Sequence, residues 1–251
     1  MAANGETASA RILSIGARTP HARLGVAVVE DLVNVIVSGE LQPGDTLPPE
    51  GPLAQQFGVS RTVLRESIKR VEEKGLLTVA QGRGTQVQPM TSWNILDRVV
   101  LTALISHDDS LGVLNELSIV RARLESTMAA STAEHRTKEQ LGELRAAIDR
   151  MRSAVDAPED FIEADVSFHE LVMAFSGNRL AESIARSLYE RARDSRRFHG
   201  SISQQDLHQA VDEHEAVVLA IAAGDPAGAE RNMESLILEA WRRRRFPDAT
   251  A

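Results

Sequence analysis

The sequence contains no cysteine and no long apolar run. Without cysteine the chain forms neither disulfide bonds nor thiolate zinc sites, and it has no cysteine nucleophile. The longest apolar candidate, Val99–Ser106, is far shorter than the roughly 20 residues that span a membrane. Residues 1–20 lack the compact apolar core of a signal peptide. We therefore expect a cytoplasmic protein with no membrane partner, which begins with a disordered tail over residues 1–21.

Basic residues are fewer than acidic ones, 28 against 36, which gives a net charge of −8 over 251 residues. Taken whole, this balance argues against nucleic acid as a partner. The charge is unevenly distributed, however, because residues 1–90 contain nine basic and nine acidic residues. Within Arg61–Arg83, six basic residues stand against three acidic ones. The excess acid therefore belongs to residues 91–251, and the first 90 residues contain a local basic segment.

Residues 22–89 predict a small mixed domain in which helices precede a hairpin. The apolar spacing, the N-cap at Ser60 and the stop at Gly75 set its elements. The predicted elements are helices over 24–38, 53–57 and 60–75, followed by strands over 76–79 and 85–87. This order is helix, helix–turn–helix, hairpin.

Residues 90–251 predict an all-helical domain, because helical periodicity continues almost to the end of the chain. Its first helix is expected at Trp93–Ile105, Thr137 and Gln140 suit a capping box, and Gly224 ends a later helix. The predicted fold class is mainly α. An N-terminal winged helix–turn–helix (α+β) precedes an all-α bundle of six or seven helices.

Two short predicted helices on either side of Gly58 have the arrangement of a helix–turn–helix. The second presents Ser60, Arg61, Thr62 and Arg65 near its N-terminal end, where side chains reach base edges in the major groove. Arginine pairs bidentately with guanine, and serine and threonine bind phosphates or bases. The alternative interpretation is a solvated basic helix of a small winged domain.

The tip of the predicted hairpin, Gln81-Gly82-Arg83-Gly84, places an arginine between glycines, which suits a wing that touches the minor groove or the DNA backbone. Several motifs stand in fixed order: Leu47-Pro48-Pro49-Glu50, Phe57-Gly58-Val59-Ser60-Arg61, Leu64-Arg65-Glu66, Gly75-Leu76-Leu77 and Gly82-Arg83-Gly84-Thr85. In this order they resemble the winged helix–turn–helix of the GntR family of bacterial transcription regulators. In one departure, Gly51 stands where many relatives carry arginine.

The resemblance implies a homodimer that binds a two-fold related operator in double-stranded DNA. It also implies that Arg61 and Arg65 read bases, with Ser60, Thr62 and residues 81–83 beside them.

Asp165 and His169 lie four residues apart on one predicted helix, so both side chains point the same way, as two ligands of one metal would. His214 lies on the apolar face of another predicted helix. From spacing alone, the alternative is a helical ion pair between Asp165 and His169, with His214 as an ordinary core histidine.

The helical domain is similar to the FCD effector domain of the FadR subfamily. The matching residues are Arg121, Glu125, Asp165, His169, Asn178, Leu180, His214 and Ala220–Asp225. In metal-binding members the ligands are one Asp and three His, so the resemblance implies a divalent metal (Zn, Ni, Mn or Fe) on Asp165, His169 and His214. The fourth ligand position is occupied by Leu236.

Ser92–Asp97, Phe168-His169-Glu170 and the missing last histidine resemble regulators of sugar-acid catabolism of the galactonate-responsive kind. The resemblance implies a repressor that is released by a small hydroxy or keto carboxylate. Arg121 would clamp the carboxylate, and Asn178 would hydrogen-bond the polyol. The alternative for Arg121 is an ion pair with Glu125, one turn along its helix.

Two other functions compete with this interpretation. A metal-sensing repressor would use the same three ligands with the metal as its signal, and a metal-dependent hydrolase would use an open coordination position to activate water. No motif supplies a nucleophile or a positioned general base, so we expect no enzymatic activity. The run Arg242–Arg245 suits a helix C-terminus, whose dipole favours cations, and the alternative is contact with DNA phosphate or with the other domain.

Overall fold

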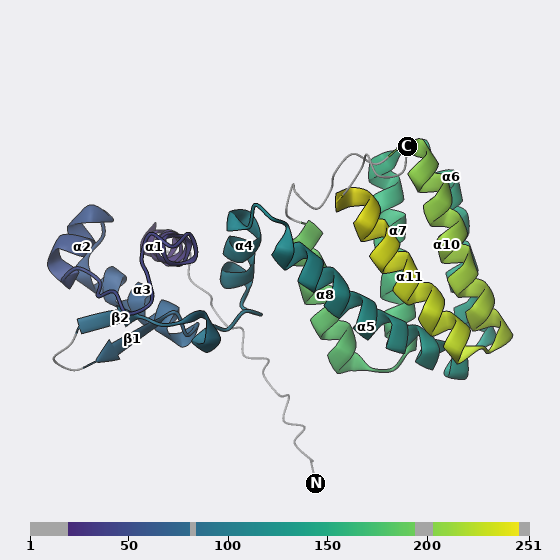
Figure 1. The fold of residues 1–251 in the computed structure, drawn as a ribbon, viewed down its shortest axis with the longest axis horizontal. Helices are drawn as coiled ribbons and strands as arrows, with labels where there is room; N and C mark the ends of the chain where they lie inside the picture. The colour runs from purple at the N-terminus through teal and green to yellow at the C-terminus, as the bar shows by residue number, and fades with distance from the viewer. Residues whose placement is uncertain (1–19, 81–83, 194–202, 246–251) are drawn as a thin grey trace, which may run out of the picture. The chain divides into compact units, whose positions relative to one another are not determined.

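The computed structural model describes residues 20–80, 84–193 and 203–245 (Figure 1). The chain divides into two compact units, Met1–Asn94 and Ile95–Ala251, and each is described by itself. Residues 1–19 of the expected tail and the predicted wing residues Gln81, Gly82 and Arg83 lie outside the described residues. Residues 20 and 21, which the prediction also placed in the tail, belong to the first helix instead.

The first unit is a winged helix–turn–helix. Its elements are α1 (Pro20–Val37), α2 (Glu50–Gln56), α3 (Arg61–Glu73), β1 (Leu77–Ala80), β2 (Gly84–Val87) and the short 3-10 helix η1 (Met90–Ser92). The strands are antiparallel, with Leu77 opposite Val87. Helix α1 packs against α3, and Val33, Leu64 and Val71 are fully buried.

The turn from α3 into β1 depends on a glycine. Gly75 has a φ of +81°, which L side chains rarely adopt. A Cβ atom at this position would lie 2.0 Å from the carbonyl oxygen of Ser92, so a side chain would also clash with the backbone that leads out of the hairpin. The predicted stop at Gly75 therefore has two physical causes, and it fixes the place where the chain leaves α3.

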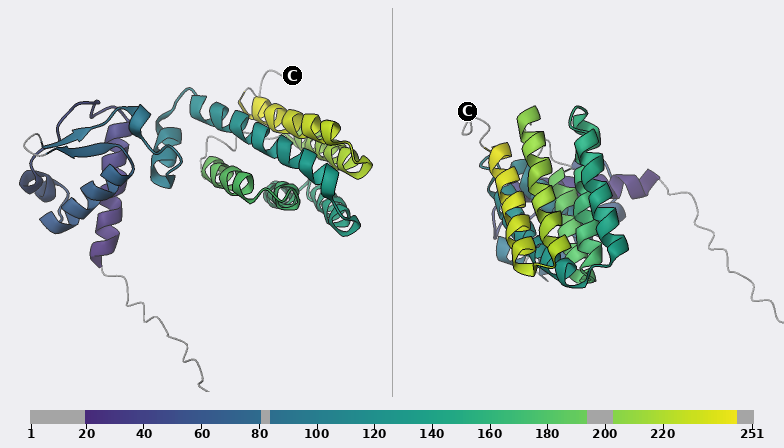
Figure 2. Two further views of the ribbon diagram at one scale, coloured as in Figure 1. Left: turned by 90° about the horizontal axis from the view of Figure 1, so that it is seen from below. Right: turned by 90° about the vertical axis from the view of Figure 1, so that its right-hand side faces the viewer.

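The second unit is all-helical, and its described part contains seven helices: α4 (Arg98–His107), α5 (Gly112–His135), α6 (Lys138–Ser153), α7 (Pro158–Phe175), α8 (Arg179–Arg193), α10 (Gln204–Ala223) and α11 (Pro226–Arg245). The long helix α5 contacts α7, α8, α10 and α11, and α10 also packs against α6 and α11. Figure 2 shows these helices side by side. The predicted fold class is confirmed for both units.

Local capping explains most helix boundaries. Ser60 caps α3 by accepting a hydrogen bond from the backbone N–H of Val63, and Thr137 and Gln140 form the expected capping box of α6. Gly224 ends α10 in the left-handed conformation at φ +67°. Pro158 occupies the first turn of α7, where its missing N–H has no helical partner to lose.

The predicted start of a helix at Trp93 is wrong. The helix begins at Arg98, because the side chain of Asp97 accepts hydrogen bonds from the backbone N–H groups of Val99 and Val100. The indole N–H of Trp93 instead donates to the carbonyl oxygen of Gln88 at 2.9 Å, which ties this segment to the winged unit. The apolar residues before Asp97 extended the periodic pattern without belonging to a buried helical face.

Candidate metal centre and DNA-reading helix

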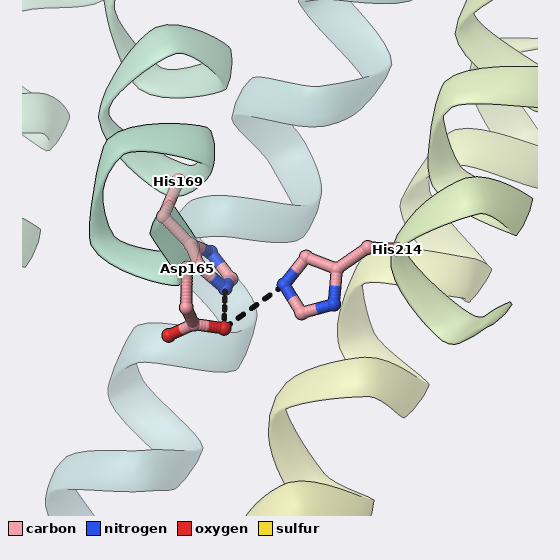
Figure 3. A group of neighbouring side chains, drawn as sticks. All are labelled: Asp165, His169 and His214. Carbon is pink, nitrogen blue, oxygen red and sulfur yellow. Dashed lines mark ion pairs between the residues drawn. The ribbon is translucent and has the colours of Figure 1, made fainter. Parts of the chain in front are cut away.

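Three side chains with metal-ligand chemistry meet inside the helical unit. Asp165 and His169 project from α7, and His214 projects from α10 toward the same carboxylate (Figure 3). Oδ1 of Asp165 lies 3.0 Å from Nε2 of His214 and 3.9 Å from Nε2 of His169. One ligand atom from each residue lies within 4.8 Å of the other two, and both histidines are buried. The structure therefore brings together all three predicted ligands.

In each imidazole, the hydrogen bond made by Nδ1 determines whether Nε2 carries a proton or a lone pair. Nδ1 of His214 lies 2.6 Å from the carbonyl oxygen of Ala210, and Nδ1 of His169 lies 2.6 Å from Oε2 of Glu125. A carbonyl or carboxylate oxygen accepts only, so both Nδ1 atoms carry the proton and donate. In the neutral rings the Nε2 lone pairs then face Asp165, which is the arrangement of metal-ligating histidines.

One buried atom has no ordinary partner. Nε2 of His214 is completely shielded from solvent and makes no hydrogen bond within the described part of the chain. Its lone pair points at an anionic oxygen, and two electron-pair donors in contact repel each other unless a proton or a cation lies between them. The donor set and this orphaned atom fit a divalent cation at the centre of the three residues.

Two carboxylates at the site stay ionised, although Glu125 is buried and Asp165 is half-buried. Burial raises the pKa of Glu125, but the charge of Arg121 and the hydrogen bonds from Arg121 and His169 outweigh it and lower the pKa to about 2. Burial likewise opposes ionisation of Asp165, whereas its contacts with His214 and His169 and the charge of Arg244 hold its pKa below the ordinary range. Asp165 is thus an anionic ligand at neutral pH.

Arg121 makes the ion pair with Glu125 that its spacing predicts, and it also lines the cavity of the candidate site. Its Nε donates to Oε1 of Glu125 at 2.8 Å, which is the expected one-turn ion pair. Its Cζ lies 4.0 Å from the centre of the Tyr189 ring, a cation–π contact. The side chain also lines the cavity that contains the three candidate ligands. Burial and the charges of Asp165 and Glu125 raise the pKa of Tyr189 against the opposing charge of Arg121, so its hydroxyl stays neutral.

The cavity beside the three ligands has a mixed lining. Apolar walls alternate with polar and charged groups, and Leu236 is part of the wall where the fourth ligand was expected. The other lining residues include Ser118, Arg121, Phe161, Ile162, Tyr189, Asp206, Leu207, Trp241, Arg243 and Arg244. A small polar anion with some apolar surface matches this lining.

Asn178 does not belong to this group. Its side-chain oxygen accepts a hydrogen bond from the backbone N–H of Ala181 at 3.1 Å, which caps the start of α8. The residue is exposed and is not among those that line the cavity. The structure therefore does not bring Asn178 together with the three candidate ligands and Arg121.

The predicted base-reading side chains stand on the surface of the winged unit. Arg61, Thr62 and Arg65 are exposed on the first turns of α3, directly after Ser60. Nε and Nη2 of Arg65 donate to the two carboxylate oxygens of Glu50 at 3.0 and 2.6 Å. This bidentate pair lowers the pKa of Glu50 and raises that of Arg65, chiefly through the hydrogen bond between them.

Gly51 leaves room for the side chain of Arg61. A Cβ atom at Gly51 would lie 3.2 Å from Nη2 of Arg61, so the guanidinium passes over the bare backbone of α2. Helix α2 thus contacts both arginines of the recognition helix, Arg61 through Gly51 and Arg65 through Glu50.

Comparisons with known proteins agree with this architecture. Residues 24–87 match the bacterial regulatory proteins of the gntR family, and residues 116–239 match the FCD domain. The galactonate operon transcriptional repressor of Escherichia coli K12 is 32% identical over 218 residues, which cover 86% of this chain and 94% of that protein. The chain belongs to the GntR family. It is a regulator of the FadR type, with an FCD domain behind the winged domain.

One further relative and one solved structure are similar to this GntR-family chain. The regulator LutR of Bacillus subtilis is 30% identical over 203 residues, which cover 79% of this chain and 91% of that protein. The solved structure of Lar, which controls the agr system of Listeria monocytogenes, has a TM-score of 0.55 with 18% identity and covers 91% of this chain and 98% of its own, so it shows the shared fold. The chain is a ligand-responsive, DNA-binding transcription regulator and not an enzyme. None of its described helices has the length and apolarity needed to cross a bilayer.

Sequence reasoning missed two features of this GntR-family site. The one-turn spacing predicts Glu125 only as a partner for Arg121, whereas it also holds His169, which lies 44 residues further along the chain. Tyr189 was not singled out, although it stacks against Arg121 and contacts Asp165 at 3.4 Å through its hydroxyl. The only sequence signal for the contact between Glu125 and His169 is an acidic residue on an apolar helix face in a chain that also has a metal-binding pattern. The contacts of Tyr189 with Arg121 and Asp165 depend on helix packing alone.

Proposed function

We propose that this regulator is a homodimeric repressor of a sugar-acid or hydroxycarboxylate catabolic operon, released from its operator by a small carboxylate. The observation that carries the proposal is the convergence of Asp165, His169 and His214 on one point, with Arg121 in the wall of the same cavity. The relative named for the galactonate operon supports the class of operon.

A divalent metal on these three residues is part of the proposal. One carboxylate and two imidazoles suit Zn, Ni, Mn or Fe. Each imidazole already has its second nitrogen held by a hydrogen-bond acceptor, which orients the ring toward the ligand position. When bound, the metal would supply a Lewis acid for a hydroxyl or carboxylate oxygen of the effector. Leu236 leaves the position of the expected fourth ligand without a donor, which keeps it open to water or effector.

Arg121 would bind the carboxylate of the effector. Its Nε is engaged by Glu125, and neither terminal nitrogen has a hydrogen bond in the described part of the chain. Those two nitrogens present a donor pair that matches a carboxylate. The ring of Tyr189 supports the guanidinium plane, so the donor pair is held in position before the effector arrives.

On the DNA side, we propose that Arg61 and Arg65 read bases in the major groove, and that Ser60 and Thr62 bind phosphates or bases beside them. From the sequence alone, we also propose that the wing residues Gln81–Arg83 touch the minor groove or the DNA backbone. The winged unit is neutral, so affinity would depend on short-range contacts rather than on the long-range field of the chain.

The effector would act by binding the DNA-incompetent arrangement of the dimer more tightly than the competent one. The test is release of labelled operator DNA from the full-length protein. At constant metal, we expect galactonate or a related sugar acid to release DNA, and galactose to leave it bound. Release by metal alone would instead identify a metal-sensing repressor.

A matched pair of variants tests the metal centre. His208 and His214 both lie on α10, and the Nδ1 of each contacts the carbonyl oxygen four residues earlier. His208 is exposed, whereas His214 is buried in the site. We expect His214→Ala to abolish stoichiometric binding of Zn²⁺ or Ni²⁺ in calorimetry and His208→Ala to preserve it. Equal metal binding by both variants would refute the proposed centre.

A further inference from the structure

The hairpin of β1 and β2 has one covered edge and one open edge. The backbone N–H groups of Gly44 and Leu47 donate to the carbonyl oxygens of Val87 and Thr85 at 2.9 and 2.8 Å, so β2 is paired on both sides. On the other side of β1, the described part of the chain contains no further strand. Strand β1 is therefore an edge strand, whose outward backbone N–H groups bond to water or to side chains.

Glu72 supplies one such acceptor from the recognition helix. Its Oε1 accepts a hydrogen bond from the backbone N–H of Val79, the third residue of β1, at 2.9 Å. Val79 is 55% exposed, so apolar burial does little to hold this part of β1. The hydrogen bond thus joins the end of α3 to the strand that leads toward the predicted wing tip (Figure 1).

Glu72 lies on the same face of α3 as the two predicted base-reading arginines. It follows Arg65 by seven residues and Arg61 by eleven, and these spacings correspond to about two and three turns of an α-helix. Seven residues rise about 10 Å along the helix axis, which is close to the roughly 12 Å width of the major groove. Glu72 therefore attaches β1 about one groove width from the point where Arg65 would reach the bases.

The negative charge of Glu72 argues against a direct contact with DNA, because phosphates repel a carboxylate. We propose that Glu72 is a positioning residue for operator binding, which fixes the hairpin relative to Arg61 and Arg65. With the hairpin held, contacts in the major groove and beside it form together, and binding requires less ordering. The inference rests on the proposed function, in which the two arginines read bases, and adds a residue that itself contacts no DNA.

The experiment is a gel-shift assay of the full-length protein on two DNAs. One is the operator that the wild-type protein selects from a random library, and the other is a scrambled sequence of the same length. We expect Glu72→Ala to weaken binding to the operator by about 10-fold, because the hairpin is no longer fixed to α3. Binding to the scrambled sequence should stay equal or rise by up to about 3-fold, because a negative charge near the phosphates is lost.

Two further variants separate the hydrogen bond from the charge. Glu72→Gln removes the charge but keeps an acceptor oxygen, so its operator affinity should lie within about 3-fold of the wild type. Glu73→Ala removes the same charge from the exposed neighbouring position. It should change binding to both DNAs in the same direction, by no more than about 3-fold.

A hydroxyl-radical footprint gives a second readout, which a loss of folding alone does not produce. On the operator, Glu72→Ala should keep the protection at the centre of each half-site, where α3 binds. It should lose the protection that flanks the half-site, where the hairpin binds. Glu72→Gln and Glu73→Ala should both keep the wild-type footprint.

The outcomes separate this inference from the proposed function. Operator affinity in Glu72→Ala equal to wild type, or an equal loss on both DNAs, would overturn the positioning role of Glu72. Failure of Glu72→Gln to recover operator affinity would overturn it too, because the acceptor is retained. If Arg61→Ala and Arg65→Ala leave operator affinity unchanged, the proposed base reading is wrong. In that case a selective loss in Glu72→Ala still supports Glu72 as the residue that positions the hairpin, and no loss overturns it.

Discussion

Glu125 holds His169 and Arg121 with the two oxygens of one carboxylate. Oε2 accepts a hydrogen bond from Nδ1 of His169 at 2.6 Å, and Oε1 accepts one from Nε of Arg121 at 2.8 Å. All three side chains are at least nine-tenths buried. A candidate metal ligand and the candidate carboxylate clamp therefore share one support, so a shift of either ring or guanidinium is transmitted to the other through Glu125.

Glu125→Gln should weaken metal binding without abolishing it. Glutamine has nearly the same shape, but its amide lacks the charge that orients His169 and raises the basicity of the ring. We expect the affinity for Zn²⁺ to fall by about 10- to 100-fold. Arg121 also loses a buried counter-charge, which should lower the free energy of unfolding of the metal-free protein by about 3–5 kcal/mol. Calorimetry and urea denaturation measure the two effects.

Glu116→Gln is the control for this variant, because Glu116 lies on the same helix and is exposed. It should leave both quantities within about 0.5 kcal/mol of the wild type. Wild-type zinc affinity in Glu125→Gln would contradict the support of His169 by Glu125.

The stability of the metal-free protein should fall in acid through Glu125. Its pKa is lowered from 4.5 to about 2, so the folded state binds a proton less readily than the unfolded state. The stabilisation is complete above pH 4.5 and is lost as the pH falls from 4.5 toward 2. The total loss should be on the order of 3 kcal/mol, of which about 2 kcal/mol falls between pH 6 and pH 3. Urea denaturation with a chelator at these two pH values measures this part.

Asp165 titrates in the same direction, so the wild-type curve contains both carboxylates. The difference between wild type and Glu125→Gln isolates the contribution of Glu125. If the two proteins lost the same stability between pH 6 and pH 3, the paired state of Glu125 would not contribute to the acid dependence.

Local signals in the sequence predicted most of the fold. Ser60, Thr137 and Gly224 act within one helical turn of themselves, so their capping roles follow from residue type and spacing. The start of α4 was missed because Asp97, four residues beyond Trp93, satisfies the first N–H groups of the helix. Apolar periodicity before a cap resembles apolar periodicity inside a helix, and only the hydrogen bonds distinguish them.

The candidate site was less predictable, because its parts come from different helices. The spacing of Asp165 and His169 on one helix was visible in the sequence, and the family resemblance added His214. The support of His169 by Glu125, and the presence of Arg244 in the wall of the cavity, depend on how α5, α7 and α11 pack. No spacing within one helix encodes those contacts. Asn178 is the opposite case. The family resemblance implies that it contacts the effector, whereas in the structure its side chain caps a helix.

Arg61→Ala and Arg65→Ala should each weaken specific operator binding by about 1–3 kcal/mol, because each removes a side chain that reaches base edges. Arg70 is the control, since it is exposed on the same helix but lies near the opposite end. Arg70→Ala should weaken binding to operator and to unrelated DNA equally. A gel-shift assay on both DNAs measures the effects, and unchanged operator affinity in both test variants would refute the assignment of the recognition helix.

Glu50→Gln separates the fold from DNA reading in the same helix. The ion pair between Glu50 and Arg65 is exposed, because 39% of the Glu50 side chain and 71% of the Arg65 side chain are accessible to solvent. Its loss should change the free energy of unfolding by no more than about 1 kcal/mol. We expect weaker operator binding, because Arg65 loses the bidentate contact that holds its guanidinium in place. The thermal midpoint and the gel shift, measured on one preparation, check both statements, and operator affinity equal to wild type would show that Glu50 does not position Arg65.

Leu236→His should convert the three-ligand centre into a four-ligand centre. Leu236 is 2% exposed and lines the cavity beside His214, so an imidazole in its place lies within the same pocket. A fourth donor should raise the affinity for Zn²⁺ by about 10-fold or more, while burial of an unpaired imidazole destabilises the metal-free protein by about 1–3 kcal/mol.

Leu236→Met, which nearly conserves volume, should change stability by less than about 1.5 kcal/mol and leave zinc affinity unaltered. Because a fourth protein ligand fills the position left for the effector, Leu236→His should also bind galactonate less tightly than the wild type when both are metal-loaded. Zinc affinity in Leu236→His no higher than in Leu236→Met would mean that the metal does not lie at the point where Asp165, His169 and His214 converge.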